Sequence, residues 1–337
     1  MERSSLFKRT DRRFFLKSLV LLGITFVFIG NLAWGEEIYP AKNITWLIPY
    51  KPGGGTDISA RAISPFIEKQ IKKISSKAKG GKLIIKNEPA GGGEKAISSL
   101  YKAAPDGYLI GTFAGAFLAE KYLFEKDYDI TKLTYLVRLD EMTSLLVTSK
   151  SGPKDWNEIV AASKIKPLKW GVGPFGRGLH VTSIIANEVL GLPAKFIPFG
   201  GTAESINGLI RGDVQLMTIS DDSAKSLIDA GELRVLLALD KKSAYPGAVS
   251  IQDLGHPELV NLTKAHRFLA APPGLPQEIK KTIVKAFQAA CKDEGFLAWS
   301  KKSGFEFNPL YGNDLEMLVK EMTDFYKEKA SVMKKYL

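Results

Sequence analysis

A glycine-rich turn between an apolar segment and a helical pattern is suited to binding a small anion. Residues 44–48 (Ile-Thr-Trp-Leu-Ile) indicate a buried strand, and residues 49–57 (Pro-Tyr-Lys-Pro-Gly-Gly-Gly-Thr-Asp) follow it directly. Apolar residues in 58–71 then recur at the spacing of one helix face. Glycines allow close backbone approach, and a helix N-terminus presents unpaired N–H groups with a partial positive charge. The turn therefore predicts a site for a small anion such as a carboxylate, although a tight connection capped by Thr56 or Asp57 explains the same residues.

Two further turns of this kind follow the next apolar segments. Residues 83–85 lead into a turn at 87–94 that contains three consecutive glycines, and residues 108–112 lead into the turn 113–115. Because strand, turn and helix alternate, the sequence predicts a parallel sheet with helices on its faces. The carboxyl ends of parallel strands meet at one edge, where ligands bind, so all three turns are expected at that edge.

The middle of the chain repeats this architecture. Apolar segments that indicate strands occur at 168–173, 195–199, 214–219 and 235–239, and the loops that follow the first three of them lie at 174–180, 200–204 and 220–222. The first two of these loops are followed by helical patterns. The repeat predicts a second α/β unit, and hence two lobes with a cleft between them.

Two apolar stretches are candidates for crossings between the lobes. The chain could pass to the second lobe within 133–149 and return at 265–271, after which residues 277–337 show mostly helical patterns and are expected to pack on the first lobe. The expected division is a leader (1–35), a first lobe (36–139 and 265–337) and a second lobe (140–264).

The sequence offers little for nucleophilic catalysis. A hydrolase needs a nucleophile, a base and an orienting acid, and no Gly-x-Ser-x-Gly elbow is present. The histidines are His180, His256 and His266. His180 stands at an expected helix start in a cleft loop, where it either binds a carboxylate or packs locally; both alternatives stay open. We expect no catalytic residues.

Cofactor and metal patterns are also weak. The spacing Gly-x-Gly-x-x-Gly at 171–176 resembles a dinucleotide loop, but Pro174 lies inside it and the next strand ends at 199–200 without the acidic residue that binds ribose. The pair Asp221-Asp222 is the one acidic pair near the expected cleft, and helix capping explains it equally well. The sequence therefore predicts no cofactor and no metal.

Composition indicates a folded protein with a preference for anionic partners. The chain has 337 residues, 45% hydrophobic, with a net charge of +11. Residues 1–35 hold six Lys or Arg and two acids, so the remainder carries 41 basic and 34 acidic residues, a net charge of +7. The lysines are scattered without an arginine–aromatic cluster, so no nucleic-acid partner is expected. Cys291 is the lone cysteine, which excludes an internal disulfide, and it is expected to pack in or beside a helix.

The N-terminal residues have the three-part form of an export signal. Residues 10–17 carry two adjacent arginines followed by Phe-Phe-Leu-Lys, residues 18–29 are apolar, and residues 33–35 offer small residues for cleavage near Gly35. The arginine pair resembles a twin-arginine signal. An uncleaved anchor is the alternative, and in either case the body is expected outside the cytoplasm, in the periplasm.

Six motifs in order resemble a known receptor family. They lie at 49–57, 87–93, 104–108, 171–180, 198–204 and 212–214, and residues 39–40 and 230–234 also match the pattern. This pattern is similar to that of the extracytoplasmic solute receptors of tripartite tricarboxylate transporters, the Bug-type receptors. The resemblance implies a type II periplasmic-binding fold of two α/β lobes, and a small carboxylate ligand closed between them. It also implies delivery to the membrane components of the transporter. We expect a monomer without enzyme activity; the alternative is an exported α/β enzyme acting on a small anionic substrate.

The resemblance and the turns together predict the ligand-binding residues. In the first lobe they are Gly54, Gly55, Thr56, Asp57, Gly92, Phe113 and Ala114, and in the second they are Phe175, Gly176, Arg177, His180, Gly201, Thr202, Ser220 and Asp221. Backbone N–H groups of 54–57 are expected to hold one carboxylate, with Asp57 as a cap or a hydroxyl acceptor. Arg177 either pairs with a second carboxylate or points to solvent. This sequence departs from the family pattern at Arg177, at Asp221-Asp222, and in the basic stretch 71–82.

Overall fold

The computed structural model describes residues 38–77, 79–176, 178–260 and 262–337. Among them, Tyr39–Leu337 belongs to one structural unit. The expected export signal and Arg177 lie outside the described residues. Within the described part, no helix combines the length and the apolar character needed to cross a membrane.

The first sheet carries the strands that precede the three first-lobe turns. Its strand order is β2-β1-β3-β11-β4. The strands are β1 (Ile44–Ile48), β2 (Leu83–Asn87), β3 (Leu109–Ala114), β4 (Thr134–Met142) and β11 (Ala265–Ala271). Strand β1 is parallel to β2 and to β3, as the alternating pattern predicted. Strand β11 enters antiparallel to both β3 and β4, so the sheet is mixed.

The second sheet has the strand order β10-β9-β5-β8-β6-β7. Its strands are β5 (Ser144–Ser149), β6 (Leu168–Val172), β7 (Ala194–Pro198), β8 (Leu216–Ser220), β9 (Leu233–Ala238) and β10 (Val249–Ser250). Strand β6 is parallel to β7 and β8, whereas β5 is antiparallel to β8 and β9. We call the elements around the first sheet the first lobe, and those around the second sheet the second lobe.

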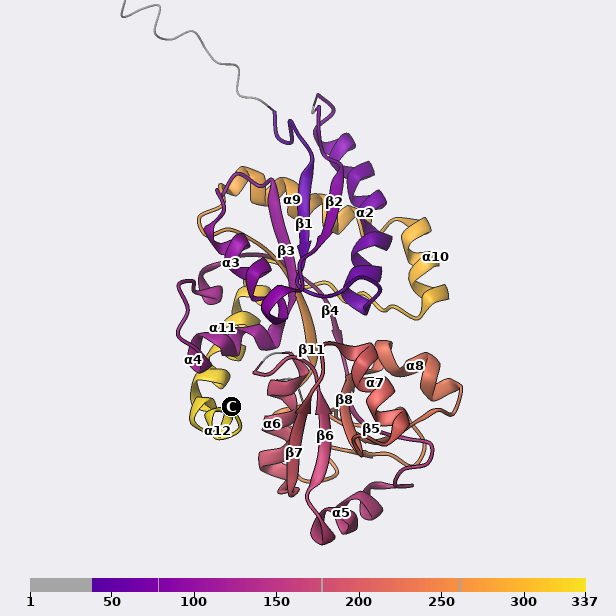
Figure 1. Cartoon of the computed structure of the whole chain (residues 1–337). Coiled ribbons are helices and arrows are strands. Elements are labelled where there is room, and N and C mark those ends of the chain that lie inside the picture. The colour runs from indigo at the N-terminus through magenta and orange to yellow at the C-terminus, as the bar shows by residue number, and fades with distance from the viewer. Residues whose placement is uncertain (1–37, 78, 177, 261) are drawn as a thin grey trace, which may run out of the picture. The chain divides into compact units, whose positions relative to one another are not determined.

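Helices connect these strands and cover the sheets (Figure 1). The α-helices are α2 (Gly55–Ile74), α3 (Glu94–Lys102), α4 (Glu120–Leu123), α5 (Trp156–Ile165), α6 (Leu179–Leu190), α7 (Thr202–Arg211), α8 (Asp221–Asp229), α9 (Gln277–Ala290), α10 (Glu294–Ser303), α11 (Gly312–Glu328) and α12 (Ala330–Lys334). Short 3₁₀ turns are η1 (Ala90–Gly93), η2 (Gly115–Ala119), η3 (Ile130–Lys132) and η4 (Pro257–Leu259).

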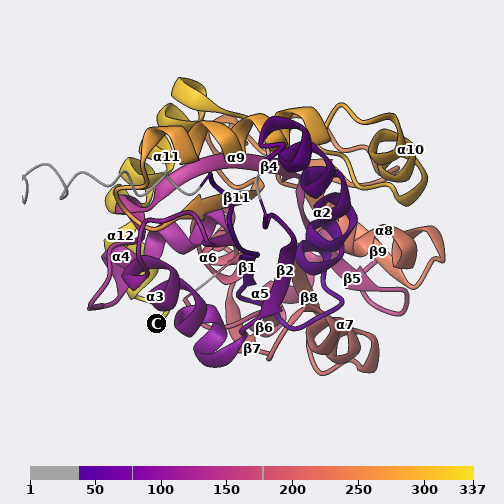
Figure 2. The ribbon, with the colours of Figure 1, turned by 90° about the horizontal axis from the view of Figure 1, so that it is seen from above.

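The first sheet is buried on both faces, which fixes the positions of its turns. Helices α2 and α9 lie on one side of the strands and α3 on the other (Figure 2). On the α9 side, the rings of Trp46 and Phe287 meet edge to face at 5.5 Å, and both side chains are fully buried. The Trp46 indole donates to the Thr112 hydroxyl at 2.7 Å, so its one polar atom is satisfied inside the core.

Two stretches of chain join the lobes. Strand β4 ends at Met142, beyond the limit expected at residue 139, and β5 begins at Ser144 in the other sheet. The chain returns to the first sheet through β11, whose bounds match the predicted crossing 265–271. The C-terminal segment is helical as predicted, with α9 packed on α2, while α12 packs on α6 of the second lobe, where the Tyr336 hydroxyl lies 3.2 Å from Glu188.

Candidate functional site

The turn between β1 and α2 is organised by the buried carboxylate of Asp57. It accepts hydrogen bonds from the Gly53 N–H at 2.9 Å, the Arg61 guanidinium at 3.0 Å and the Asn87 amide at 3.0 Å. Burial alone would raise the pKa of Asp57, but these hydrogen bonds outweigh it and hold the pKa below its ordinary value. Asp57 is therefore an ionised structural residue that closes the turn.

The N-terminus of α2 carries no side-chain cap. The N-cap residue is Gly54, whose carbonyl accepts from the N–H groups of Asp57 and Ile58 at 2.9 and 3.0 Å. The N–H groups of Gly55 and Thr56 belong to the first helical turn, which has no intrahelical acceptors for them. These two donors, together with the positive end of the helix dipole, are what this terminus offers to an anion.

A buried ion cluster lies directly against Gly55. The Arg267 guanidinium donates to Asp140 at 2.9 Å and to Asp222 at 2.5 Å, and we call these three residues the hinge cluster. A Cβ atom at Gly55 would lie 2.7 Å from Arg267 Nη2 and 3.0 Å from Asp222 Oδ2. Glycine is therefore required for α2 to approach the cluster this closely.

The hinge cluster joins the two lobes. Arg267 on β11 pairs in register with Asp140 on β4, whereas Asp222 lies in the first turn of α8 in the second lobe. All three side chains are less than 10% exposed. Burial raises the pKa of Asp140 to about 6, against the opposing attraction of Arg267. Burial also raises the pKa of Asp222, but its ion pair with Arg267 and the hydrogen bond that it accepts from the Ser223 hydroxyl hold the pKa below its ordinary value.

The second glycine turn forms η1 and faces the first turn. Gly91, Gly92 and Gly93 have φ values of 62°, 66° and 96°, a left-handed backbone that favours glycine. A Cβ atom at Gly93 would lie 2.7 Å from the Cβ of Pro49, so the two turns are in close contact. Because β1 and β2 pair in parallel, their carboxyl ends and both turns lie at the same edge of the sheet, as predicted.

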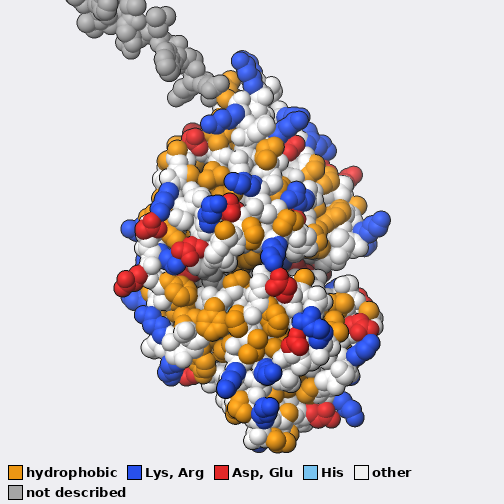
Figure 3. Space-filling view, in the orientation of Figure 1, with side chains coloured by type: hydrophobic (Ala, Val, Ile, Leu, Met, Phe, Trp, Pro, Cys, Tyr) orange, Lys and Arg blue, Asp and Glu red, His pale blue; other side chains and the backbone are white. Residues whose placement is uncertain are grey.

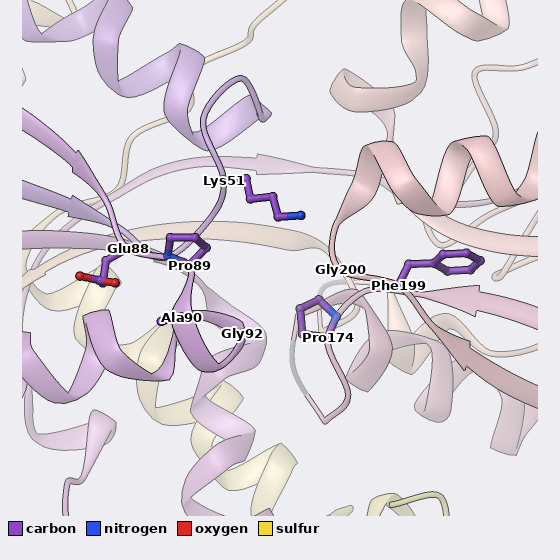
Figure 4. A pocket seen from close by; sticks show the side chains of 8 residues that line it. All are labelled: Lys51, Glu88, Pro89, Ala90, Gly92, Pro174, Phe199 and Gly200. Atoms are coloured by element: carbon purple, nitrogen blue, oxygen red, sulfur yellow. The ribbon is translucent and has the colours of Figure 1, made fainter.

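A cavity of about 480 Å³ opens between loops of both lobes (Figure 4). Its first-lobe lining follows β1 and β2, and its second-lobe lining follows β6 and β7. The lining residues are Lys51, Glu88, Pro89, Ala90, Gly92, Pro174, Phe199 and Gly200. The volume suits a small organic molecule, and the position at the carboxyl ends of parallel strands is the usual one for a ligand.

One ion pair crosses from lobe to lobe beside this cavity. Lys51 Nζ lies 2.7 Å from Glu204 Oε1, and Glu204 Oε2 accepts the Gly200 N–H at 2.8 Å. Basic and acidic side chains face each other across the groove between the two lobes in the space-filling view (Figure 3). The hydrogen bonds from Lys51 and Gly200 hold the pKa of Glu204 below its ordinary value. Its carboxylate is therefore ionised at neutral pH.

The loop after β6 places its histidine inside the second lobe. His180 is fully buried, its Nδ1 accepts the Gly176 N–H at 2.7 Å, and its ring lies 4.4 Å from that of Phe175 and 5.0 Å from that of Phe196. Burial lowers the pKa of His180 to about 4. The imidazole is neutral at neutral pH and positions the loop, which corresponds to the local-packing alternative.

The remaining sequence-predicted residues lie around strand ends. Gly201 and Thr202 begin α7, and Ser220 and Asp221 stand at the start of α8. The Ser220 hydroxyl donates to Ser223 at 3.0 Å. Asp221 accepts the Asp222 N–H at 2.8 Å, and burial raises its pKa to about 6.

Two predicted residues belong to β3 and its packing. Phe113 is fully buried among aromatic side chains, including Tyr135 and Phe268. Ala114 donates its N–H to the Tyr50 hydroxyl at 3.1 Å.

In the described residues no group of three or more His, Cys, Asp or Glu is arranged to hold a metal ion. Cys291 is half-buried beside Tyr311, and burial raises the pKa of its thiol.

Comparison with known proteins identifies the family. The model of the tripartite tricarboxylate transporter family receptor, TctC, matches residues 67–336. The chain belongs to this receptor family. Among curated relatives, a UPF0065 protein of Bordetella pertussis is 27% identical over 281 residues, covering 81% of this chain and 84% of the relative. Protein BugT of the same species is 24% identical over 294 residues, covering 83% and 87%.

Solved structures confirm the two-lobed α/β fold of a periplasmic binding protein. The periplasmic binding protein BugD superposes with a TM-score of 0.76 at 21% identity, covering 87% of this chain and 99% of BugD. MatC from Rhodopseudomonas palustris with bound malate superposes with a TM-score of 0.74 at 23% identity, covering 87% of this chain and 100% of MatC. Rpa4515 of R. palustris with adipate superposes with a TM-score of 0.74 at 22% identity, covering 88% of this chain and 98% of Rpa4515.

The receptor brings only part of the predicted site to its cavity. Gly92 lines the cavity, and the predicted residues 54–57, 175–176 and 201–202 lie within six residues along the chain of the lining residues Lys51, Pro174 and Gly200. The side chains of Phe113 and His180 are buried in the packing of the lobes instead. Arg177 lies outside the described residues.

Several residues around the cavity and the hinge were not singled out from the sequence. The predicted turns 49–57 and 200–204 contain Lys51, Gly200 and Glu204. The sequence therefore indicated the turns, but not the contact that Lys51 and Glu204 make between the lobes. Arg267 had one usable signal, a charged residue in the apolar run 265–271. A charge at that position predicts a buried ion pair, because an unpaired buried charge is too costly.

Proposed function

We propose that this receptor captures a small organic carboxylate in the periplasm and delivers it to the membrane components of a tripartite tricarboxylate transporter. The observation that carries the proposal is the cavity lined by loops of both lobes, one of which contains Lys51 and leads into the uncapped N-terminus of α2. The receptor family supports the transport role. The malate held by MatC and the adipate held by Rpa4515 support a carboxylate as the ligand class.

In this proposal one carboxylate binds at the first turn of α2. The N–H group of Asp57 already bonds the Gly54 carbonyl, which narrows the expected donors to Gly55 and Thr56. The Asp57 carboxylate faces Gly53, Arg61 and Asn87, so it holds the turn in shape rather than the ligand. In the second lobe, the start of α7 at Gly201 and Thr202 would contact the other end of the ligand.

The limit expected at residue 139 moves to Met142, the end of β4, so the lobes are proposed to be 36–142 with 265–337, and 143–264, with closure about the two crossing stretches. The described cavity lining supplies one lysine and one glutamate as its charged side chains, without a serine, cysteine or histidine to act as a nucleophile or base. This composition favours binding over catalysis. Export through the N-terminal signal and a monomeric state belong to the same proposal.

Calorimetry with malate, adipate and a panel of mono- and tricarboxylates tests the function. The purified protein should bind at least one member saturably at a 1:1 ratio, and mass spectrometry should recover that compound unchanged after prolonged incubation. A chemically altered product would instead support the exported-enzyme alternative. The absence of binding to every carboxylate would refute the ligand class.

A further inference from the structure

The carboxylate of Glu204 accepts hydrogen bonds from two residues that line the cavity, although Glu204 is not itself a lining residue. Lys51 Nζ donates to Glu204 Oε1 from the first lobe, and the Gly200 N–H donates to Glu204 Oε2 from the second. Lys51 and Gly200 are both cavity-lining residues, and the Lys51 side chain extends from its turn toward the second-lobe loops (Figure 4). The Glu204 carboxylate thus accepts hydrogen bonds from one cationic donor and one backbone donor, and both donors belong to residues that line the cavity.

The backbone at Gly200 is shaped for a carboxylate. A Cβ atom there would lie 2.6 Å from Glu204 Oε2 and 3.1 Å from Oε1, so any side chain would push the carboxylate away from the N–H group. The pair is also open to solvent, because the Lys51 and Glu204 side chains are 62% and 52% exposed. Exposed ion pairs of this kind add little stability and exchange partners readily. Displacing Glu204 would return its carboxylate to water at little cost.

We propose that Lys51 Nζ and the Gly200 N–H form a carboxylate subsite that Glu204 occupies in the ligand-free receptor and yields to the ligand. This inference rests on the proposed function and narrows it to dicarboxylates. One carboxylate binds at the N-terminus of α2, and the second replaces Glu204 between Lys51 and Gly200. Lys51 remains paired throughout, because the ligand carboxylate replaces that of Glu204 as its counter-charge.

A fixed latch is the competing role for the same contact. In a latch, the Lys51–Glu204 pair holds the lobes together in the bound state, so removing either partner weakens ligand binding. In the displacement mechanism the two partners act in opposite directions. Lys51 contributes to ligand affinity, whereas Glu204 competes with the ligand. The sign of the effect of Glu204→Gln therefore separates the two roles.

Calorimetric titration of the full-length mature protein with malate and with adipate measures that sign. Glu204→Gln removes the competing charge and should raise dicarboxylate affinity roughly threefold to tenfold, while Lys51→Gln should lower it about tenfold or more. The double variant should match Lys51→Gln within about twofold. Glu232→Gln is the matched control, because Glu232 pairs with Lys150 at 2.8 Å within the second lobe, away from the cavity lining. Unchanged or reduced affinity in Glu204→Gln would overturn the proposal.

The Gly200 amide resonance provides a readout that does not depend on the ligand class. Inorganic sulfate is the probe, added to ¹⁵N-labelled parent, Glu204→Gln and the double variant. The resonance should move at lower sulfate concentrations in Glu204→Gln than in the parent, and this gain should vanish when Lys51 is also replaced. Equal responses in all three proteins would refute the subsite. If malate and adipate fail to bind the parent while sulfate behaves as expected, the dicarboxylate assignment fails and the anion subsite stands.

Discussion

Two of the ion contacts between the lobes of this receptor, the hinge cluster and the Lys51–Glu204 pair, differ in almost every physical respect. Arg267 meets Asp222 and Asp140 where side chains are less than 10% exposed, whereas Lys51 meets Glu204 where both are more than half exposed. A buried charge cannot lose its partner without leaving an uncompensated ion, while an exposed charge exchanges its partner for water. The hinge cluster is therefore a permanent connection, and the contact beside the cavity is a replaceable one.

The position of each contact matches this difference. The hinge cluster involves β4 and β11, the two strands next to the points where the chain passes between lobes, so the proposed closure would move it least. Lys51 extends from a loop that lines the cavity and Glu204 from the first turn of α7 beside it, where the proposed closure would move the lobes further relative to each other. A hinge needs contacts that persist during rotation, and a binding site needs contacts that the ligand can replace.

Removing the hinge arginine should have the largest effect on stability. Arg267→Met leaves Asp140 and Asp222 buried without a cation, and we expect a loss of about 3–5 kcal/mol in the free energy of unfolding. Denaturant unfolding followed by circular dichroism measures it. Arg211→Met is the matched control, because Arg211 pairs with the exposed Asp213, and it should change stability by less than about 1 kcal/mol. A similar small effect for both variants would remove the distinction between buried and exposed pairs.

The glycine that contacts the hinge cluster should be the next most sensitive position. Helix propensity alone predicts that Gly55→Ala stabilises α2, but the added Cβ would lie 2.7 Å from Arg267 Nη2. We expect Gly55→Ala to lower the free energy of unfolding by about 1–3 kcal/mol. Gly54→Ala is the control, because its Cβ would meet nothing closer than 3.8 Å, and it should cost less than about 1 kcal/mol. Stabilisation by Gly55→Ala would mean that the cluster moves away freely.

The pH dependence of stability should separate two adjacent acids in α8. Burial raises the pKa of Asp221 to about 6, so the folded state keeps this proton after the unfolded state, with a pKa near 3.8, has lost it. Stability from this group is therefore present below pH 4 and is lost as the pH rises through 6. Asp221→Asn should flatten that decline and raise stability at pH 7 by about 1–3 kcal/mol.

The pKa of Asp222 is shifted in the opposite direction from that of Asp221, which makes Asp222→Asn the control for that experiment. Arg267 and Ser223 hold the pKa of Asp222 below its ordinary value, so its stabilising contribution is present above the unfolded pKa and is lost toward acid. Asp222→Asn should destabilise the protein at pH 7 and change stability less at pH 3. Parallel pH profiles for the two variants would contradict the different environments of the two carboxylates.

The strands and the turns were predictable from sequence because their signals are local. Apolar segments followed by turns rich in proline and glycine located β1, β6 and β11 to within one or two residues. The hinge cluster was not predictable, because Arg267 lies 127 residues from Asp140 and 45 from Asp222, and no local pattern encodes such a pairing. The burial of His180 is likewise a tertiary outcome.

The site was predictable only where the backbone alone determines it. Gly92 was predicted from its turn, whose left-handed conformation favours glycine, and it does line the cavity. The side chains of Lys51 and Glu204 lie in the same recognised turns, but their contact depends on how the two lobes face each other. Sequence motifs therefore locate the cavity edge and leave the cross-lobe side chains undetermined.

The smallest expected effect is the stability contribution of the Lys51–Glu204 pair, and it decides whether the comparison holds. A double-mutant cycle of Lys51→Gln and Glu204→Gln should show coupling in unfolding stability that is close to zero, because both side chains are solvated in the folded protein. At 1 M salt the Debye length falls to about 3 Å, so any residual coupling should disappear. The coupling between Arg267→Met and Asp222→Asn should persist at that salt concentration, since burial excludes the screening ions. Strong, salt-resistant coupling for Lys51 and Glu204 would make the exposed pair a structural connection like the buried one, and a ligand could not then displace Glu204 at low cost.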